Sequence, residues 1–549
     1  MTMQSRTFSE YTDLKLQPPA ADWGGLLEEW IPEFDRLQEV RRSARQRLVR
    51  NAEEFLLRLR TLADDADLPE LHNPLLTGDP ADLPIVMTGH QPVVFHSGLT
   101  FKYETTQKFA SGRQAIGVAV LIDTDQGDAG QFCFPASAAG AAAAGAATGN
   151  FAELSGNDGH PVTDGDGTAV ALPRVELQIE SLAVSMGLYG HSRLKPAAKL
   201  EQFGAQLSER LKQFGQVPAG DRVRVAMSQY AQLAATRATT AEANSILRRQ
   251  HGIGDRLLEL PLSAISAFPE SLLLTADILK QSRRFAAAYN SALDVFRDEH
   301  GIRNTANPFP NLKITGDTCE LPFWVISHNR RTRHVLEVQS EGNVTRLLAN
   351  NRVVDTFAGS ITPEALEPML LQNICIVPRG ALITAFLRLL FSDLFVHGTG
   401  GARYDRFTDE FIRSWWNVEP SAFTVASASR YLFPQAQAEL RRLETIQSEL
   451  RDLQYNPQRH FESGVFSEDL QTRLQHLTAS KLELVRQMKQ IHAGGESGRE
   501  IGRRIQQVSD QIRDAVSAEF DPQVSRLTAV TPEQRDAINC RTYPWFMFC

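Results

Sequence analysis

The feature that most constrains the fold is a strand–helix–strand succession between residues 84 and 125. "PIVMTGHQ" is a short apolar run ending at Gly89, and it is typical of a buried parallel strand. "SGLTFKYETTQKFA" follows with a helical pattern, and "AIGVAVLIDTD" supplies a second buried strand. Such a unit crosses over right-handed and places its two strands parallel. We therefore expect an α/β fold built on a parallel sheet.

Composition narrows the class of protein. The 549 residues are 42% hydrophobic and carry a formal net charge of −8, so they do not give the basic footprint of a nucleic-acid-binding protein. The five cysteines contain no CxxC pair, which argues against a disulfide framework or a zinc site, and we predict no metal. The apolar stretch 381–395 carries Arg388 and Asp393 and is expected to be a buried helix, not a membrane span. The first residues lack an apolar signal core, so we expect a cytoplasmic protein without a membrane or nucleic-acid partner.

The pattern along the chain predicts four regions. Residues 1–80 are expected to form a helical segment that packs on the core, with its helix between 32 and 67. Residues 81–433 are expected to be the catalytic core, with a flexible insertion at 135–170 and a helical one at 194–301. "TCELPFWVISHNRRTRHVLEV" indicates paired strands with a turn at Asn329. A helical arm at 434–520 and an aromatic tail at 521–549 that docks on the core complete the chain.

The arm is predicted from apolar residues at alternating spacings of three and four. Three runs share this pattern, beginning at Leu443, Leu470 and Ile501, and the turns "YNPQRHFESG" and "HAGGESG" separate them. They predict an antiparallel helical hairpin or coiled-coil arm. Plain helix packing gives the same stripes, and the seam indicates assembly of the protein more than chemistry.

The first polar cluster, "MTGHQPVVFHSG", lies at the expected carboxyl end of a strand, where open α/β sheets bind ligands. His90 and His96 are candidates to stabilise a phosphate or an oxyanion. Ser97 is expected to cap the following helix, whose free N–H groups would face the same anion, and Lys102 would add a charge. Alternatively, His90 caps the strand and His96 is an ordinary loop residue.

The second cluster follows the second strand. Asp123 and Asp125 in "LIDTDQGDAG" are candidates to bind a ribose, a cationic amine or a magnesium ion. We expect only one of these two carboxylates to face the site. An Asp-rich turn is the alternative.

The third cluster is "HGTGGARYD", from His397 to Asp405. We expect a glycine-rich loop that closes over a phosphate or carboxylate, with a helix C-cap and tight turn as the alternative. Arg379 and Glu320 are expected to be structural ion-pair partners. The P-loop, HExxH, GxSxG and strand-linked GxGxxG signatures do not occur, which disfavours P-loop kinases, zincins and α/β-hydrolases. The binding residues of this cluster are His397, Gly398, Gly400, Gly401, Arg403 and Asp405.

"TGHQPVVFHSGLTFK", "LIDTD" and "LFVHGTGGARYDRFTDEFI", followed by helical heptads, resemble the bacillithiol-biosynthesis cysteine-adding enzyme family. The resemblance is to a divergent relative of that family. It implies a Rossmann-like core related to class I aminoacyl-tRNA synthetases and nucleotidylyl transferases, with inserted segments. It also implies a coiled-coil arm that mediates homodimerisation.

Activity and site residues follow from the same resemblance. The family joins the carboxylate of cysteine to the amine of a glucosaminyl malate, and a nucleotide such as ATP is associated with it. Its TGQQ…GP segment falls on Thr88, Gly89, His90, Gln91 and Gly98, with His90 in place of the first glutamine, and the proline is missing. Its DHD segment falls on Asp123, Thr124 and Asp125, so its central histidine is absent.

The resemblance therefore implies a carbon–nitrogen ligase acting on small-molecule substrates, with His90, His96, Asp123 and Asp125 as its catalytic residues. Two alternatives stay open. One is a nucleotidylyl transferase for another small metabolite, and the other is an inactive dimeric scaffold that binds a ligand.

Overall fold

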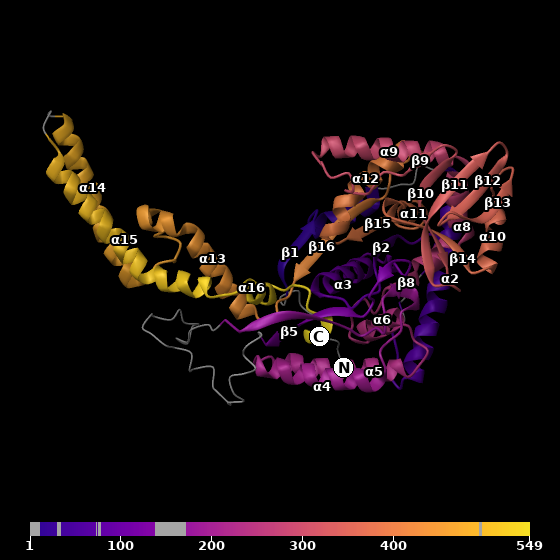
Figure 1. Ribbon diagram of the computed structural model, residues 1–549, viewed down its shortest axis with the longest axis horizontal. Coiled ribbons are helices and arrows are strands. Elements are labelled where there is room, and N and C mark those ends of the chain that lie inside the picture. The colour runs from indigo at the N-terminus through magenta and orange to yellow at the C-terminus, as the bar shows by residue number, and fades with distance from the viewer. Residues whose placement is uncertain (1–10, 30–34, 73, 75–77, 138–171, 494–496) are drawn as a thin grey trace. The chain divides into compact units, whose positions relative to one another are not determined.

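The computed structural model describes residues 11–29, 35–72, 74, 78–137, 172–493 and 497–549 (Figure 1). The chain divides into two compact units. The first consists of the described parts of Met1–Phe134, Ile179–Arg430 and Arg541–Cys549. The second consists of the described parts of Pro135–Gln178 and Tyr431–Cys540. Most of the insertion expected at 135–170 lies outside the described residues.

A six-stranded, mostly parallel sheet forms the centre of the first unit. Its order is β1 (Thr12–Gln17), β16 (Ala422–Ser429), β15 (Leu394–His397), β2 (Ile85–His90), β3 (Ile116–Leu121) and β8 (Leu258–Pro261). Only β1 runs antiparallel to its neighbour. The expected strand–helix–strand unit is confirmed as β2, α3 (Ser97–Gly112) and β3. β2 is the first of the parallel strands along the chain. The next two, β3 and β8, lie on one side of it and the last two, β15 and β16, lie on the other, so the strand order reverses between β2 and β15.

Helices cover both faces of this sheet, as a parallel sheet requires. Val86 of β2 packs on one face with Phe101 of α3 and with Trp23 of α1 (Trp23–Glu29). Its neighbour Met87 points the other way, into the largest core cluster, which includes Leu48 of α2. That core also takes in α11 (Ala381–Leu390) and α12 (Thr399–Trp416). Helix α2 (Asp35–Asp65) matches the helix expected between residues 32 and 67.

A second, antiparallel sheet carries the predicted strand pair, and that prediction is confirmed. β10 (Thr318–Ser327) and β11 (Thr332–Glu341) are neighbours in it, with the turn between them. The sheet runs in the order β13 (Arg352–Ala358), β12 (Val344–Ala349), β11, β10 and β14 (Ile374–Pro378), and β9 (Ile314–Thr315) also pairs with β10. α10 (Pro363–Leu371) connects β13 to β14.

The region 194–301 is helical as predicted, except that β8, a strand of the main sheet, lies within it. The helices are α4 (Ala197–Gln213), α5 (Val217–Ala234), α6 (Thr240–Gln250), α7 (Leu262–Ser266), α8 (Pro269–Lys280) and α9 (Ser282–Glu299). Four residues of β8 are too few to show a strand period between helices. Short strands before this region are β4 (Gln126–Gly127), β5 (Gln131–Ser137), β6 (Val175–Ser181) and β7 (Gly187–Leu188). The 3-10 turns of the unit are η2 (Ala20–Asp22), η4 (Tyr189–His191) and η6 (Trp545–Met547).

The prediction of one buried helix over residues 381–395 is wrong for the last residues of that range. α11 ends at Leu390, and Leu394–His397 form the strand β15 between β2 and β16. The apolar residues of a short buried strand continue the pattern of the helix before it, so periodicity does not separate them. None of the helices within the described ranges combines the length and apolar character that a bilayer crossing requires.

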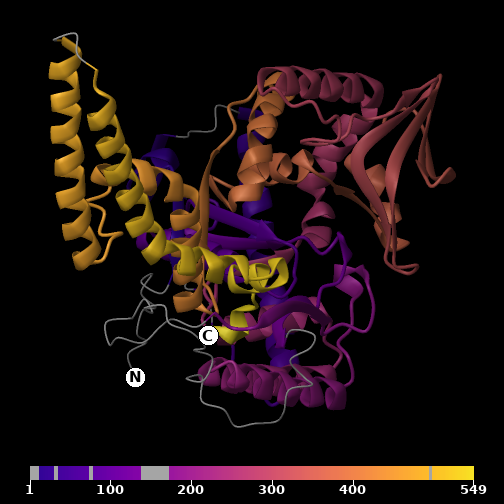
Figure 2. The same ribbon diagram turned by 60° about the vertical axis from the view of Figure 1, so that its left-hand side comes forward.

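The second unit is helical. It contains α13 (Pro434–Tyr455), η5 (Pro457–Arg459), α14 (Glu468–Ala493), α15 (Arg499–Thr528) and α16 (Pro532–Ile538). α14 and α15 lie side by side in both views (Figures 1 and 2). Seam residues such as Ile446, Leu474 and Ile512 share one buried cluster. The boundary expected at residue 520 falls inside α15, and only Arg541–Cys549 of the expected tail belong to the first unit, where Trp545 is buried.

Asp393 joins the start of β2 to α2 through a buried ion-pair network. Its carboxylate accepts hydrogen bonds from the Ile85 backbone N–H at 2.7 Å, from Arg41 at 3.0 Å and from Arg45. We expect Asp393→Ala to lower the free energy of unfolding of the first unit by about 3–5 kcal/mol, because two buried guanidinium groups lose their partner. Urea denaturation followed by tryptophan fluorescence measures it.

Asp82→Ala is the matched control, because Asp82 pairs with Arg42 on the exposed surface. We expect almost no change from it. Equal effects of the two substitutions would contradict a special role for the Asp393 network.

Candidate functional site

The carboxyl ends of the parallel strands form one edge of the main sheet. Val396 pairs with Thr88, so His397 lies beside Gly89 across β15 and β2. His90 pairs with Leu121, which in turn pairs with Pro261 of β8. The strand order reverses between β2 and β15, and in open α/β sheets ligands bind outside the carboxyl ends near such a reversal.

A cavity of about 180 Å³ lies at this edge, beyond the ends of β3 and β8. Asp123 and Thr124 follow β3, Ser263 lies in α7, and His328 follows β10 of the second sheet. The main sheet thus provides one side of the cavity and the antiparallel sheet another. The complete lining is Asp123, Thr124, Leu188, Gly190, His191, Ser263, Ile326 and His328.

Asp123 is held in place by Ser263. The Ser263 hydroxyl donates to Oδ2 at 2.5 Å, and the Ser263 backbone N–H donates to Oδ1 at 3.0 Å. Burial raises the pKa of the Asp123 carboxyl, although the two Ser263 donors and nearby His328 favour the carboxylate. A fixed carboxylate in a small cavity is suited to bind a cation such as an ammonium group.

Two histidines face each other in the same cavity. His191 Nε2 and His328 Nδ1 lie 3.1 Å apart, so one ring donates and the other accepts. Burial, His328 and the nearby Arg331 and Arg193 lower the pKa of His191. The lowered pKa favours the neutral form of His191, which can accept a proton.

Asp125 does not line this cavity. Its Oδ1 accepts from Arg333 Nη1 at 2.6 Å, and its Oδ2 accepts from Gln91 Nε2 at 2.9 Å. The expectation that only one of the two aspartates faces the site fits this arrangement, and that residue is Asp123. The structure does bring the first two clusters together, because Gln91 and Asp125 are bonded to each other.

His90 lies next to this contact. Its Nδ1 donates to the Gln91 carbonyl at 3.0 Å, and burial, Lys102 and His96 lower the pKa of His90 to about 3. Lys102 is buried, and its Nζ donates to the Gly89 carbonyl at 2.8 Å. Burial lowers the pKa of Lys102 to about 7. Thr88 donates to the Val396 carbonyl at 2.8 Å and so ties β2 to β15.

The prediction that Ser97 caps α3 is wrong. His96 is the N-cap, and its Nδ1 accepts from the Gly98 N–H at 3.1 Å. Ser97 is the first helical residue, and its hydroxyl donates to the Arg541 carbonyl at 3.1 Å. Burial, Arg541 and Lys102 lower the pKa of His96 to about 4. The Gly98 N–H is occupied by this cap, so it is not free for an anion as expected.

The expected glycine-rich loop is also wrong, because its residues begin helix α12. Gly398 is the N-cap with φ −82°, and Gly400 and Gly401 lie in the first turn without positive φ. Among the described residues, no side chain caps this N-terminus, so its N–H groups are available at the carboxyl edge. Arg403 is exposed, and among the described residues it makes no hydrogen bond or ion pair.

His397 and Asp405 form a buried network beneath that N-terminus. His397 Nε2 donates to Asp405 Oδ2 at 2.7 Å, and Arg388 and Thr384 donate to the same carboxylate at 3.0 and 2.6 Å. Burial raises the pKa of the Asp405 carboxyl, but His397 and Arg388 outweigh it and hold it below its ordinary range. Asp405 is therefore a structural anion that positions His397.

The structure thus collects the predicted residues along one edge without placing them in one cavity. Asp123 lines the cavity, and His90, Gln91, Asp125, His397 and Gly398 lie at neighbouring strand ends. Sequence reasoning missed His191, Ser263 and His328. The only signal for them was the pair of histidines in "YGHS" and "SHNRR", and nothing in the sequence indicates that those segments meet.

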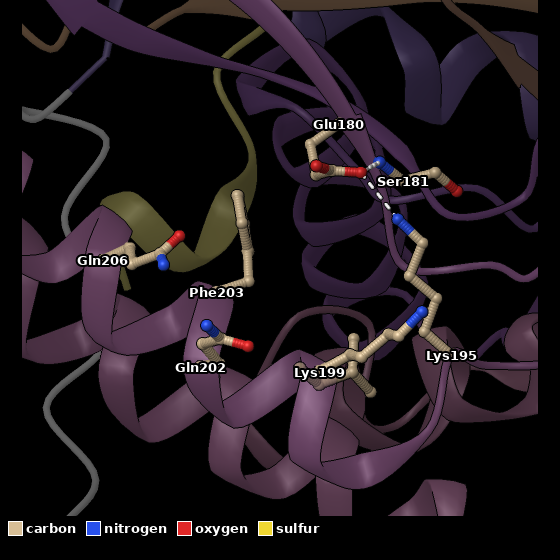
Figure 3. A pocket seen from close by; sticks show the side chains of 8 residues that line it. Glu180, Ser181, Lys195, Lys199, Gln202, Phe203 and Gln206 are labelled. Atoms are coloured by element: carbon tan, nitrogen blue, oxygen red, sulfur yellow. Dashed lines mark hydrogen bonds and ion pairs between the residues drawn. The ribbon is translucent and has the colours of Figure 1, made fainter.

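A larger cavity of about 270 Å³ lies between β6 and the first half of α4 (Figure 3). The ion pair of Lys195 Nζ with Glu180 Oε1, at 2.7 Å, forms one wall. Lys199, Gln202 and Phe203 project from α4 on the other side (Figure 3). This cavity contains none of the predicted site residues and shares no lining residue with the cavity at the sheet edge.

No protein-family model matches the sequence, and no curated protein sequence matches it. We therefore infer the function from the geometry of the carboxyl edge of the main sheet and from the sequence motifs that lie there.

Gly401 offers a test of the His397 network. A Cβ at position 401 would lie 2.6 Å from His397 Nδ1, whereas a Cβ at Gly400 would meet nothing within 4 Å. We expect Gly401→Ala to displace the imidazole and lower stability by about 1–3 kcal/mol. Gly400→Ala should be neutral or stabilise by about 0.5–1 kcal/mol, as alanine does in a helix. Thermal denaturation compares the two, and equal melting temperatures would contradict the close approach.

Proposed function

We propose that the first unit is a Rossmann-like catalytic domain that joins the carboxylate of an amino acid to the amine of a small acceptor. The sheet supports this class, since its five parallel strands follow the order third, second, first, fourth, fifth along the chain. The motif likeness to the cysteine-adding enzymes supports the reaction type. The observation that carries the proposal is that Asp123 and the His191–His328 pair line one cavity.

The cavity is the proposed amine site. Asp123 binds the ammonium group, and an opposite charge favours the carboxylate that burial disfavours. His191, whose lowered pKa favours the neutral imidazole, then removes a proton from the bound ammonium. The free amine nitrogen attacks the carbonyl carbon of the activated carboxylate, the C–N bond forms, and the C–O bond to the phosphate leaving group breaks.

The proposed activating nucleotide is ATP, bound nearer the strand reversal. The uncapped N-terminus of α12 supports this placement, because free N–H groups and the helix dipole favour phosphate. Gly398 and Gly400 leave open space beside it, since a Cβ at either position would meet nothing within 4 Å. In this proposal His90 and Lys102 shape the adjoining end of β2 through their hydrogen bonds to the Gln91 and Gly89 carbonyls.

The test of the reaction is incubation with ATP, an amino acid such as cysteine, and amino-sugar conjugates, followed by mass spectrometry. We expect a product whose mass is the sum of the two substrates less one water. Asp123→Asn should lower the rate by about 100-fold or more, because it removes the charge that binds the amine.

Asp128→Asn is the matched control. Asp128 accepts from the Gly130 N–H and the Ser181 hydroxyl through Oδ1 alone, and an asparagine oxygen keeps both bonds. Its rate should stay near that of the wild type. Absence of a condensed product with every substrate pair would refute the ligase and favour the ligand-binding scaffold.

The histidine pair predicts the pH dependence. Because the pKa of His191 is lowered, His191 becomes protonated only below the ordinary histidine value of 6.5. The turnover rate should therefore be level near pH 7 and fall on the acid side below pH 6.5. His328→Asn should change this acid limb, and a limb that stays the same would remove the pair from the mechanism.

A further inference from the structure

Two arginines of the second sheet flank a single tryptophan. The guanidinium carbon of Arg333 lies 4.3 Å from the Trp324 ring centroid, and that of Arg379 lies 4.6 Å from it. Arg333 belongs to β11 and Arg379 follows β14, and these strands pair with opposite sides of β10, which carries Trp324. The two guanidinium groups therefore approach the indole from opposite sides.

A carboxylate holds each arginine by one nitrogen. Arg333 Nη1 donates to Asp125 and to the Thr124 carbonyl at 3.1 Å, and Arg379 Nη2 donates to Glu320. The side chains are only 17% and 18% exposed. A planar guanidinium that is stacked and tethered in this way is fixed in orientation before any ligand arrives.

Both arginines have N–H donors that make no hydrogen bond within the described residues. These donors are Nε and Nη2 of Arg333 and Nε and Nη1 of Arg379. Among the described residues, the buried side-chain nitrogen and oxygen atoms without a hydrogen-bond partner include Arg249 Nε and Trp416 Nε1. They include no atom of Arg333, Arg379 or Trp324. Their unused donors therefore reach solvent. They are therefore accessible to an anion that arrives from solvent.

Arg333 contacts residues that line the cavity. Arg333 donates to the carbonyl of Thr124, and it lies opposite Ile326 in the β10–β11 register. Thr124 and Ile326 both line the cavity that holds Asp123 and the histidine pair. A cationic group at the rim of a cavity that binds an amine is placed to receive the second, anionic substrate.

We propose that Arg333 and Arg379, held on either side of Trp324, bind a carboxylate or phosphate group of the substrate that reacts at the neighbouring cavity. Arginine presents a planar fork of donors that matches the oxygens of both groups. The identity of the reacting substrate rests on the proposed function, whereas anion binding itself does not. Trp324 is a positioning residue, because it orients the two guanidinium groups.

The test is direct binding of two probes to the full chain, measured by titration calorimetry at low salt. Pyrophosphate offers only phosphate oxygens and tricarballylate only carboxylate oxygens, so the tighter probe identifies the group that the site prefers. We expect Arg333→Gln and Arg379→Gln each to weaken that probe about tenfold or more, the worth of a charge-assisted hydrogen bond. Arg346→Gln is the control, since Arg346 pairs with Glu341 on the same sheet but far along it from Trp324.

Arg333→Lys keeps the charge but not the fork, and it guards against a glutamine variant that fails to fold. We expect it to weaken binding less than Arg333→Gln does. Failure of both probes to bind the wild type, or equal affinities in the Arg333, Arg379 and Arg346 variants, would overturn the proposal. Anion binding without any condensed product would leave this site standing and refute the ligase alone.

Discussion

The pairing of β2 with β15 on one side and β3 on the other is the constraint on which the first unit depends. A parallel strand in the middle of a sheet is buried on both faces, so its side chains must pack against other apolar side chains on each face. Val86 and Met87 point into different clusters for this reason. The same pairing aligns the carboxyl ends of four strands, and the polar groups that follow β2, β3 and β15 lie along one edge because of that alignment.

Charge at this edge is governed by burial. His90, His96 and Lys102 lie close together without a carboxylate partner in the described residues, and burial lowers the pKa of all three. They therefore act through hydrogen bonds to Gln91, Gly98 and Gly89. The charges that persist are the paired ones, such as Asp125 with Arg333. The strand ends thus carry two kinds of polar group, which are side chains in which burial disfavours charge and ion pairs in which charge is kept.

The sequence predicts local features well where a residue type has a strict local requirement. The apolar runs before Gly89 and Asp123 indicate β2 and β3, because a buried strand needs such a run. The hairpin at Asn329 is equally local. β8 and β15 escape prediction because each has only four residues and adjoins an apolar helix. His191 and His328 escape it for another reason, since only tertiary packing brings segments 137 residues apart into contact.

The antiparallel sheet has a consequence for how such a protein can diversify. Its strands, with Trp324, His328, Arg333 and Arg379, come from one continuous stretch, residues 314–379, whereas the parallel sheet gathers strands from the whole of the first unit. Changes confined to that stretch alter the groups above the strand ends and leave the pairing of β2, β3 and β15 intact. The architecture therefore allows the groups above the strand ends to change while the parallel sheet, and with it the fold, stays the same.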